Sequence, residues 1–372
     1  MEPKGDGVNT KLHGWHVAAK ARMADFGGWD MPIQYPTGPK EEHLKVRSAA
    51  GLFDIDHMGR LEVSGRDALA FLQGVQTWDL SRVAVGSAHY ALLLNDAGGI
   101  LDDIFVYRLP TSWLVVVNAS NAATDRAWIE AHRGAHEVTL RDRAADTCMV
   151  ALQGPAARAI LTPLCAGVDL ASFEHHGVVD CRVAGGPAIL CSTGYTGEPG
   201  YEILLSAADC EARWSRILEA GAAQGLIPCG LAARDSLRAE ACLPLYGHEM
   251  DSRIDPFTAG LAKAGVSLDG HQFIGKDALK QLSEKEPVSR LVGFEMVEPG
   301  VPRSGYPILS GDAQIGRVTT GLFSPSTGRY LGMGYVDSSL GAVGQGILIL
   351  IRDTPKRATI VRRPFYRSPH WR

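Results

Sequence analysis

The sequence predicts a soluble protein of mixed α+β class with about two or three domains, the last of them a small antiparallel β-barrel. The composition, 45% hydrophobic and 21% charged over 372 residues, is ordinary for a chain that can bury a sizeable core. Helix and strand patterns alternate through most of the chain. A charged, Pro-containing segment between Leu282 and Val288 then precedes short strands separated by Gly, Pro and Ser.

We therefore expect a domain boundary between residues 284 and 285. Residues 1–284 would form an α+β region, and residues 285–372 would form the barrel. The strand patterns of the barrel include Leu291–Met296, Pro307–Leu309, Gly316–Thr320 and Ile347–Ile351.

Several classes of protein do not fit the sequence. The net charge is −4, and no long basic run precedes the Arg362–Arg363 pair, so a nucleic-acid interface is not expected. No apolar run approaches the roughly 20 residues that span a bilayer. The N-terminus resembles neither a signal peptide nor a transit peptide. The seven cysteines are odd in number and form no C-x-x-C motif, which favours reduced thiols in the cytoplasm over disulfides or zinc.

The elements of the first half follow from periodicity and from helix-breaking residues. We expect a helix that begins at Asp67, with its cap near Ser64. The other elements expected here are a short helix or turn in Lys11–Ala24, a strand from Trp29 to Tyr35, a helix over Pro39–Ala50, a strand pair in Gly51–Gly65, a strand at Trp113–Asn118 and a helix over Thr124–His132.

From Cys148 onward strands and helices alternate. Glu211–Ala223 is an amphipathic helix with Trp214 and Ile217 on one side, and Gly230–Ala241 is another helix. A metal site is not expected. Asp54, Asp56 and His57 lack a further ligand at a recognisable spacing, and His132 and His136 suit the polar end of their helix.

The most informative stretch is the hairpin Leu92–Tyr107, in which two apolar runs flank a Gly-containing link. Its second strand begins with two acids, whose side chains must point to opposite faces. Asp102 falls in the row that looks core-facing, whereas Asp103 falls in a row with Phe105 and Tyr107. That second row suits the wall of a pocket for a flat, nitrogen-rich ring. The alternative is that one acid closes the turn and the other is solvated.

Glu202 lies in the predicted strand Tyr201–Leu205, after a Gly-rich run that matches neither a Rossmann nor a phosphate-loop motif. It shares a face with Leu204, and an unpaired carboxylate in an apolar row is costly. Its partner is either the N–H groups of a heterocycle that carries an exocyclic amine or an internal arginine.

Arg234 lies near the start of its helix, where the dipole disfavours a cation. Either Asp235 and Glu240 neutralise it, or it binds an anion such as a ligand carboxylate.

Eight sequence blocks occur in one order from about Leu12 to Arg367: ARMADFGGWDMPIQYP, FDIDHMG, LLLNDAGGILDDIFVYRL, ALQGP, TGYTGEPGYEI, GLAARDSLRAEA, LYGHEMD and FIGKDAL. Together they closely resemble the T-protein, or aminomethyltransferase, family of the glycine cleavage system. The resemblance implies a three-domain cloverleaf with tetrahydrofolate in a central channel. Residues 1–284 would then be the folate-binding region, two intertwined subdomains with the hairpin subdomain at about 52–140.

The resemblance also implies a reaction and a set of site residues. A lipoylated H-protein would deliver an aminomethyl group, ammonia would leave, and tetrahydrofolate would take the one-carbon unit. Asp103 would be the catalytic acid. The folate-binding residues would be Glu202, Arg234, Tyr195, Asn118, Tyr107 and Arg367. We expect a cytoplasmic enzyme that acts as a monomer and has no nucleic-acid or membrane partner.

Two other functions share the fold: a tetrahydrofolate-dependent demethylase, and a non-catalytic folate-binding protein linked to iron–sulfur maintenance. The second carries a cysteine in a K-G-C-Y-x-G-Q-E block, and the comparable LPLYGHEM has none. Asp56 and Trp78 depart from the family, which usually has Ser and Asn at these positions.

Overall fold

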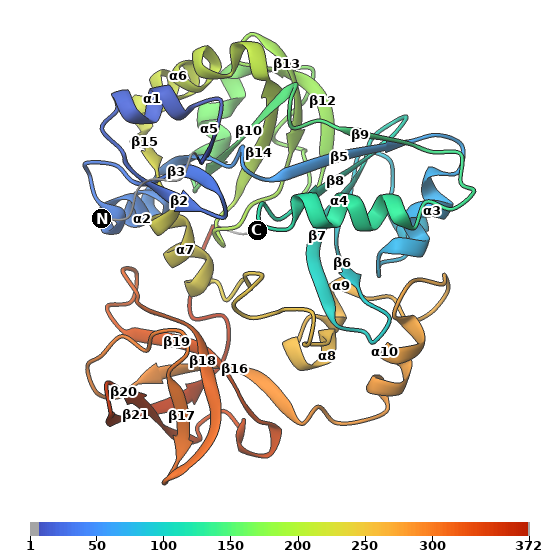
Figure 1. The fold of residues 1–372 in the computed structure, drawn as a ribbon. Helices are drawn as coiled ribbons and strands as arrows, with labels where there is room; N and C mark the ends of the chain where they lie inside the picture. The colour runs from blue at the N-terminus through green and yellow to red at the C-terminus, as the bar shows by residue number, and fades with distance from the viewer. Residues whose placement is uncertain (1–6, 371–372) are drawn as a thin grey trace.

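We describe a computed structural model of the chain, in which residues 7–370 are placed. Two sheets lie side by side in the upper part of the molecule, and a closed barrel lies below them (Figure 1). A small sheet near the N-terminus has the order β1 (Val8–Asn9), β3 (Trp29–Gln34), β2 (Arg22–Phe26). The mixed α+β class and the C-terminal barrel are both confirmed. Within residues 7–370, no helix is both long and apolar enough to cross a membrane.

The larger sheet has seven strands with helices packed on it. Its order is β11 (Cys165–Ala166), β12 (Val178–Val183), β13 (Gly186–Cys191), β14 (Gly200–Ser206), β10 (Thr147–Gln153), β4 (Ala50–Asp54) and β15 (Leu226–Cys229). The associated helices are α1 (His13–Ala18), α2 (Pro39–Ser48), α5 (Ala157–Leu161), α6 (Cys210–Gly221) and α7 (Leu231–Glu240). Trp214 and Ile217 of α6 are fully buried against one face, as its amphipathic pattern predicts.

The second sheet has five strands and contains the hairpin. Its order is β6 (Ala88–Leu94), β7 (Ile100–Arg108), β8 (Trp113–Val117), β5 (Gly59–Ser64) and β9 (Thr139–Asp142), with helices α3 (Ala68–Val75) and α4 (Ala122–Ala131). The hairpin pairs β6 with β7, so that Leu92 lies opposite Asp103. Tyr107 and Leu114 of this sheet share a core cluster with Leu204 of the seven-stranded sheet. The two sheets therefore pack against each other through the faces that carry Tyr107 and Leu204.

Two local expectations for this region are wrong. Gly51–Gly65 does form two strands, but β4 pairs with β10 and β15 whereas β5 pairs with β8 and β9. The strands belong to different sheets because the link between them, which includes His57, crosses from one sheet to the other. The cap of α3 is Asp67 rather than Ser64, and it makes no side-chain capping bond.

The expectation of seven reduced thiols is also wrong. Cys148 of β10 and Cys210 of α6 form a disulfide, with their Cα atoms 6.1 Å apart. Both residues are buried in the same core cluster, where the start of α6 packs on the sheet. The pair is 62 residues apart in sequence and has no motif spacing. The other five cysteines are free.

The C-terminal part begins with three short helices, α8 (Pro256–Ala259), α9 (Ala262–Gly265) and α10 (Lys276–Ser283). The barrel follows in the closed order β16 (Ser289–Met296), β19 (Tyr330–Asp337), β18 (Ala313–Phe323), β17 (Pro307–Ser310), β20 (Gly346–Ile351) and β21 (Thr354–Val361). Phe294, Val318 and Ile349 fill its interior. Every pairing in it is antiparallel. The division of the chain at residue 284 stays a prediction.

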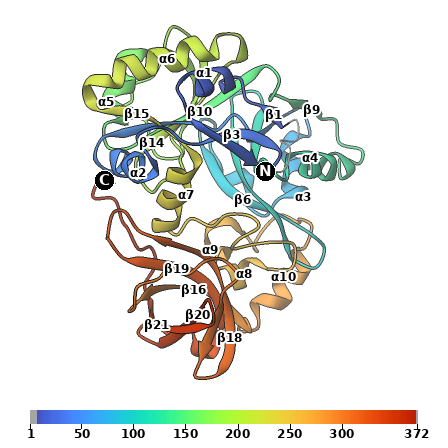
Figure 2. The ribbon, with the colours of Figure 1, turned by 60° about the vertical axis from the view of Figure 1, so that its left-hand side comes forward.

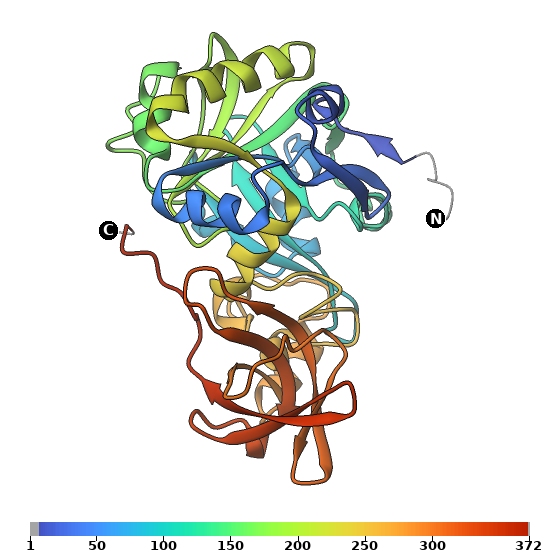
Figure 3. The ribbon, with the colours of Figure 1, turned by 90° about the vertical axis from the view of Figure 1, so that its left-hand side faces the viewer.

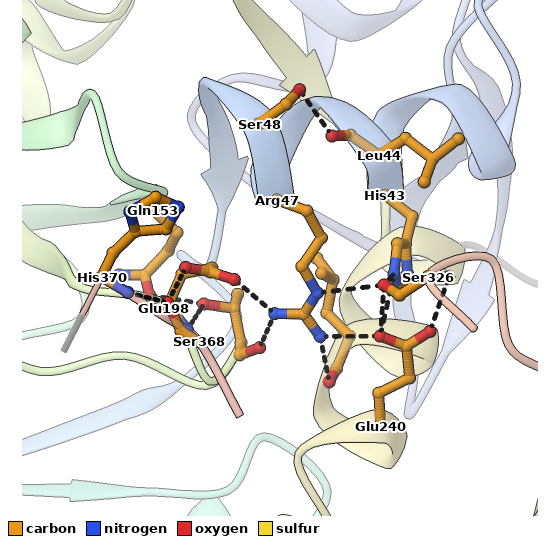
Figure 4. Close-up of polar contacts among 12 residues, drawn as sticks. His43, Leu44, Arg47, Ser48, Gln153, Glu198, Glu240, Ser326, Ser368 and His370 are labelled. Carbon is orange, nitrogen blue, oxygen red and sulfur yellow. Dashed lines mark hydrogen bonds and ion pairs between the residues drawn. The ribbon is translucent and has the colours of Figure 1, made fainter. Parts of the chain in front are cut away.

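A buried polar network joins the barrel to the upper part of the molecule. Helix α7 lies between the two (Figure 2), and the C-terminal segment rises from the barrel toward the upper sheets (Figure 3). At the end of α7 the Glu240 carboxylate accepts hydrogen bonds from His43 Nε2 at 3.1 Å, Arg47 Nη2 at 3.0 Å and Ser326 Oγ of the barrel at 2.7 Å (Figure 4). Arg47 also binds Glu198 at 3.1 Å. A single network thus fixes α2, α7, the barrel and the loop before β14.

Candidate active site

A cavity of about 360 Å³ opens where the two upper sheets meet α7. Residues of three of these elements face it: Asp103 of β7, Glu202 of β14 and Arg234 of α7. Six of the seven site residues predicted from the sequence line the cavity, namely Asp103, Tyr107, Asn118, Tyr195, Glu202 and Arg234.

The seventh, Arg367, is exposed on the C-terminal segment and does not line this cavity. A folate-binding role for Arg367 stays a prediction.

The two hairpin acids lie on opposite faces of β7, as strand geometry requires. Asp102 is fully buried, whereas Asp103 is only partly buried and faces the cavity. The alternation continues along the strand, with Ile104 and Val106 in the core of the five-stranded sheet. Phe105 lines the cavity on the Asp103 side. Asp103 is therefore the acid of the pair that a ligand in this cavity would meet.

Asn118 connects the two acids. Its Nδ2 atom donates to Asp102 Oδ1 at 2.9 Å and to Asp103 Oδ1 at 2.7 Å, and its backbone N–H donates to Asp102 Oδ2 at 2.9 Å. Asn121 Nδ2 donates a further bond to Asp102 at 2.8 Å. Both oxygens of the buried Asp102 carboxylate therefore act as hydrogen-bond acceptors for N–H groups.

Asp103 has a different electrostatic environment. Burial, and next the negative charge of Asp102, raise the pKa of Asp103 to about 7, although the hydrogen bond from Asn118 opposes the shift. A carboxyl group with a pKa near the working pH can both donate and accept a proton. Asp103 is thus suited to acid–base chemistry at the cavity wall.

Glu202 is held by neutral hydroxyl groups. Thr193 Oγ1 donates to its carboxylate at 2.6 Å and Tyr107 OH donates at 3.3 Å. Among residues 7–370 no arginine forms an ion pair with Glu202, so the internal-arginine alternative lacks a direct contact. Its carboxylate, only partly buried, can accept further N–H groups from a ligand in the cavity.

Arg234 lacks the neutralising partners considered from the sequence. Asp235 pairs with Arg238 at 2.8 Å, and Glu240 belongs to the network with His43 and Arg47. The guanidinium carbon of Arg234 lies 4.9 Å from the centre of the Tyr195 ring. Its Nη1 atom is buried and has no hydrogen-bond acceptor among the described residues. Burial lowers the pKa of Arg234, and the Glu202 charge opposes that effect. A buried donor that faces a cavity without a partner is suited to bind an oxygen of a ligand.

Two further features of the cavity could not be derived from sequence patterns. Tyr195 OH donates to the backbone oxygen of Pro244, which fixes the ring over which Arg234 lies. His57 is 4% exposed, and its Nδ1 atom has no partner among the described residues. Burial, and next the charge of Arg234, lower the pKa of His57 to about 3, so the imidazole is neutral. Its ring packs edge-on against Phe26 with centroids 5.6 Å apart.

Two of the residues weighed as metal ligands, Asp54 and Asp56, have other partners. Asp54 binds His16 at 2.8 Å, and Asp56 pairs with Arg60 at 3.0 Å. The described part of the chain contains no group of three His, Cys, Asp or Glu side chains that could hold a metal ion.

Comparison with known proteins agrees with this geometry. Residues 12–269 match the family described as the GCVT N-terminal domain, and residues 290–367 match the glycine cleavage T-protein C-terminal barrel domain. The chain belongs to the aminomethyltransferase (T-protein) family of the glycine cleavage system. The resemblance found in the sequence blocks is thereby confirmed.

Individual relatives of the T-protein family match nearly the whole chain. The aminomethyltransferase of Symbiobacterium thermophilum is 47% identical over 370 residues, which is 98% of each chain. The aminomethyltransferase of Herpetosiphon aurantiacus is 45% identical over 96% of this chain and 98% of its own. The crystal structure of the glycine cleavage system aminomethyltransferase T from Bartonella henselae superposes with a TM-score of 0.91 at 32% identity, covering 97% of this chain and 98% of that one.

Proposed function

We propose that this T-protein family member transfers a one-carbon unit from an aminomethyl group on the lipoyl arm of the H-protein to tetrahydrofolate, with release of ammonia. One observation carries the proposal: Asp103, Glu202 and Arg234 come from three different elements and line a single cavity. Two of the three have capacity left for a ligand, since Glu202 can accept further N–H groups and Arg234 has an unused donor. The family match supports the same activity.

A reduced pterin fits the chemistry of the cavity walls. One edge of such a ring carries an exocyclic amine and an adjacent N–H group, which suit the Glu202 carboxylate. Its carbonyl oxygen, or a carboxylate of the folate tail, suits the free donor of Arg234. Phe105, Tyr107 and Tyr195 supply aromatic surface for a flat ring.

Asp103 would move a proton during the reaction. The transfer breaks the C–N bond to ammonia and the C–S bond to the lipoyl sulfur, and it forms two C–N bonds to the folate. The folate loses two N–H protons. One proton is needed to convert the amino group to ammonia, and one to convert the thiolate to a thiol, so the protons balance. The pKa of about 7 lets Asp103 accept one of these protons from the folate and donate it to the leaving group. In its ionised form it also stabilises positive charge on the one-carbon unit.

We further propose that the protein acts as a cytoplasmic monomer that receives the lipoylated H-protein at the mouth of the cavity, with residues 1–284 as the folate-binding region and residues 285–372 as a separate barrel domain. The five free cysteines fit a reducing compartment, whereas the buried Cys148–Cys210 disulfide is unusual there.

A coupled assay tests the proposal. The purified protein is mixed with tetrahydrofolate and with H-protein that carries the aminomethyl group on its lipoyl arm, and methylene-tetrahydrofolate and ammonia are measured. We expect equal amounts of both products, and none when H-protein lacks the lipoyl group. The demethylase alternative predicts product from a methylated small amine without H-protein. Folate binding with no turnover in either assay would favour the non-catalytic alternative.

A further inference from the structure

Behind Asp103, a third acid lies in contact with Asp102. Asp125 is in the first turn of α4, the helix that follows β8 and Asn118. Its side chain is 2% exposed and makes a hydrogen bond with Asp102. The cluster thus runs inward from the cavity through Asp103, Asn118 and Asp102 to Asp125.

Asp125 is neutral. It forms no ion pair among the described residues, and its Oδ2 atom is buried without a hydrogen-bond partner there. The adjacent cation, Arg126, points to the surface, where it pairs with Asp142 at 3.0 Å. An ionised carboxylate at this place would be desolvated beside a second negative charge, which is strongly unfavourable. Burial, and next the charge of Asp102, raise the pKa of Asp125 to about 10.

Asp102 is the acceptor of the pair. Its two oxygens already receive N–H groups from Asn118 and Asn121, so the remaining proton of the pair belongs on Asp125. The pair therefore holds one proton and one negative charge, as two carboxyl groups in contact usually do.

We propose that Asp102 and Asp125 are positioning residues of the transfer reaction: they share one proton and keep one fixed negative charge, which holds the Asn118 amide and controls the ionisation of Asp103. The inference rests on the proposed function only in the test that measures transferase activity. Neither acid touches the cavity, so both act through Asn118 and through the electric field at Asp103.

The other groups around Asp103 do not supply that field. Tyr90 of β6 lines the same cavity as Asp103, and burial raises the pKa of Tyr90 well above its usual value. Burial likewise raises the pKa values of Tyr195 and Tyr246, on two loops that line the cavity, so both are neutral. The other titratable or charged groups on the cavity walls are Glu202, Arg234, His57 and His248, and none is among the main causes of the Asp103 shift. Asp102 is thus the charge that acts most strongly on Asp103.

Two isosteric variants separate the roles of the pair. Asp102→Asn removes the fixed charge, and we expect the titration midpoint of Asp103 to fall by about one pH unit or more. Asp125→Asn keeps an N–H donor to Asp102 and changes no charge if Asp125 is neutral, so the midpoint should stay near its native value. Asp142→Asn is the control, because it removes only the surface partner of Arg126, a residue of α4. We expect its midpoint and activity to be unchanged.

The midpoint is read by ¹³C NMR of aspartate carboxyl groups in the full-length protein, with Asp103→Asn to assign the signal. It is read independently from the pH profile of kcat/KM in the H-protein assay. A lower midpoint in Asp125→Asn would mean that Asp125 is ionised in the native protein and would overturn the inference. An unchanged midpoint in Asp102→Asn would also overturn it. If Asp102→Asn does not fold, the Asp125→Asn titration still tests whether Asp125 is ionised in the native protein. The NMR result stands even if no variant shows transferase activity, so failure of the proposed function is recognised separately.

Discussion

The guanidinium of Arg234 lies over the ring of Tyr195, 4.9 Å from its centre, yet one of its nitrogens is buried without an acceptor among the described residues. The ring restricts the guanidinium to one place and leaves that nitrogen available. A cation held in this way is a preformed binding group, because little side-chain order remains to be gained when a ligand arrives.

We expect Arg234→Met to weaken folate binding while leaving the protein folded. Loss of a charged hydrogen bond corresponds to roughly 1.5–3 kcal/mol, or about ten- to a hundredfold in Kd. Thermal stability should not fall, since the variant removes an unpaired buried donor. Calorimetric titration with a stable reduced folate measures the change, with Arg126→Met on the surface as the control. An unchanged Kd would exclude Arg234 from the binding site.

Asp103→Asn should lower turnover at least about a hundredfold, on the scale of a lost general acid–base group. Folate should still bind, since the shape of the side chain is kept. In the native protein, kcat/KM should rise with pH through about 7, because a folate N–H proton must pass to ionised Asp103. This limb should be missing from the variant. Near-native turnover in Asp103→Asn would remove the residue from its catalytic role.

Glu240 should make the protein sensitive to acid. Burial alone would raise the pKa of Glu240, but hydrogen bonds and charge from His43 and bonds from the barrel serines lower it from 4.5 to about 2. A depressed folded-state pKa stabilises the protein above pH 4.5, and this stabilisation is lost as pH falls toward about 2. Urea denaturation between pH 6 and pH 3 should therefore show a smaller pH dependence in Glu240→Gln. Glu295→Gln, which breaks a surface pair with Arg329 in the barrel, should behave like the native protein.

The disulfide can be detected by counting the cysteines that react with an alkylating reagent. Alkylation of the denatured protein without reductant should modify five cysteines, and reductant should expose Cys148 and Cys210 as well. The Cys148→Ala and Cys210→Ala double variant should lose roughly 2–4 kcal/mol of unfolding free energy, mainly through greater freedom of the unfolded chain. Seven modified cysteines in protein purified without reductant would contradict the pairing.

Strand periodicity was sufficient to separate Asp102 from Asp103, because successive side chains alternate faces whatever the partner strand is. It was not sufficient to place β4 and β5, since alternation reveals a buried face but not which sheet supplies the neighbour. The Cys148–Cys210 contact depends on how α6 lies on β10, which is a tertiary relation without a local pattern.

Some of the residues at the cavity could be singled out from the sequence, and others could not. Glu202 and Arg234 stood out because each was an ionisable group in an unfavourable setting. Asp125 gave no such signal, since an acid in the first turn of a helix is the favourable arrangement. Only its burial against Asp102 in the folded protein makes it unusual.

Helix α7 carries Arg234 near its start and Glu240 as its last residue. The cation that we propose binds a ligand and the carboxylate that contacts the barrel therefore lie on one helix. A chain truncated before β16 would lose Ser326 and the other contacts that the barrel makes with α7. Ligand affinity should consequently depend on a barrel whose described residues contribute no side chain to the cavity wall.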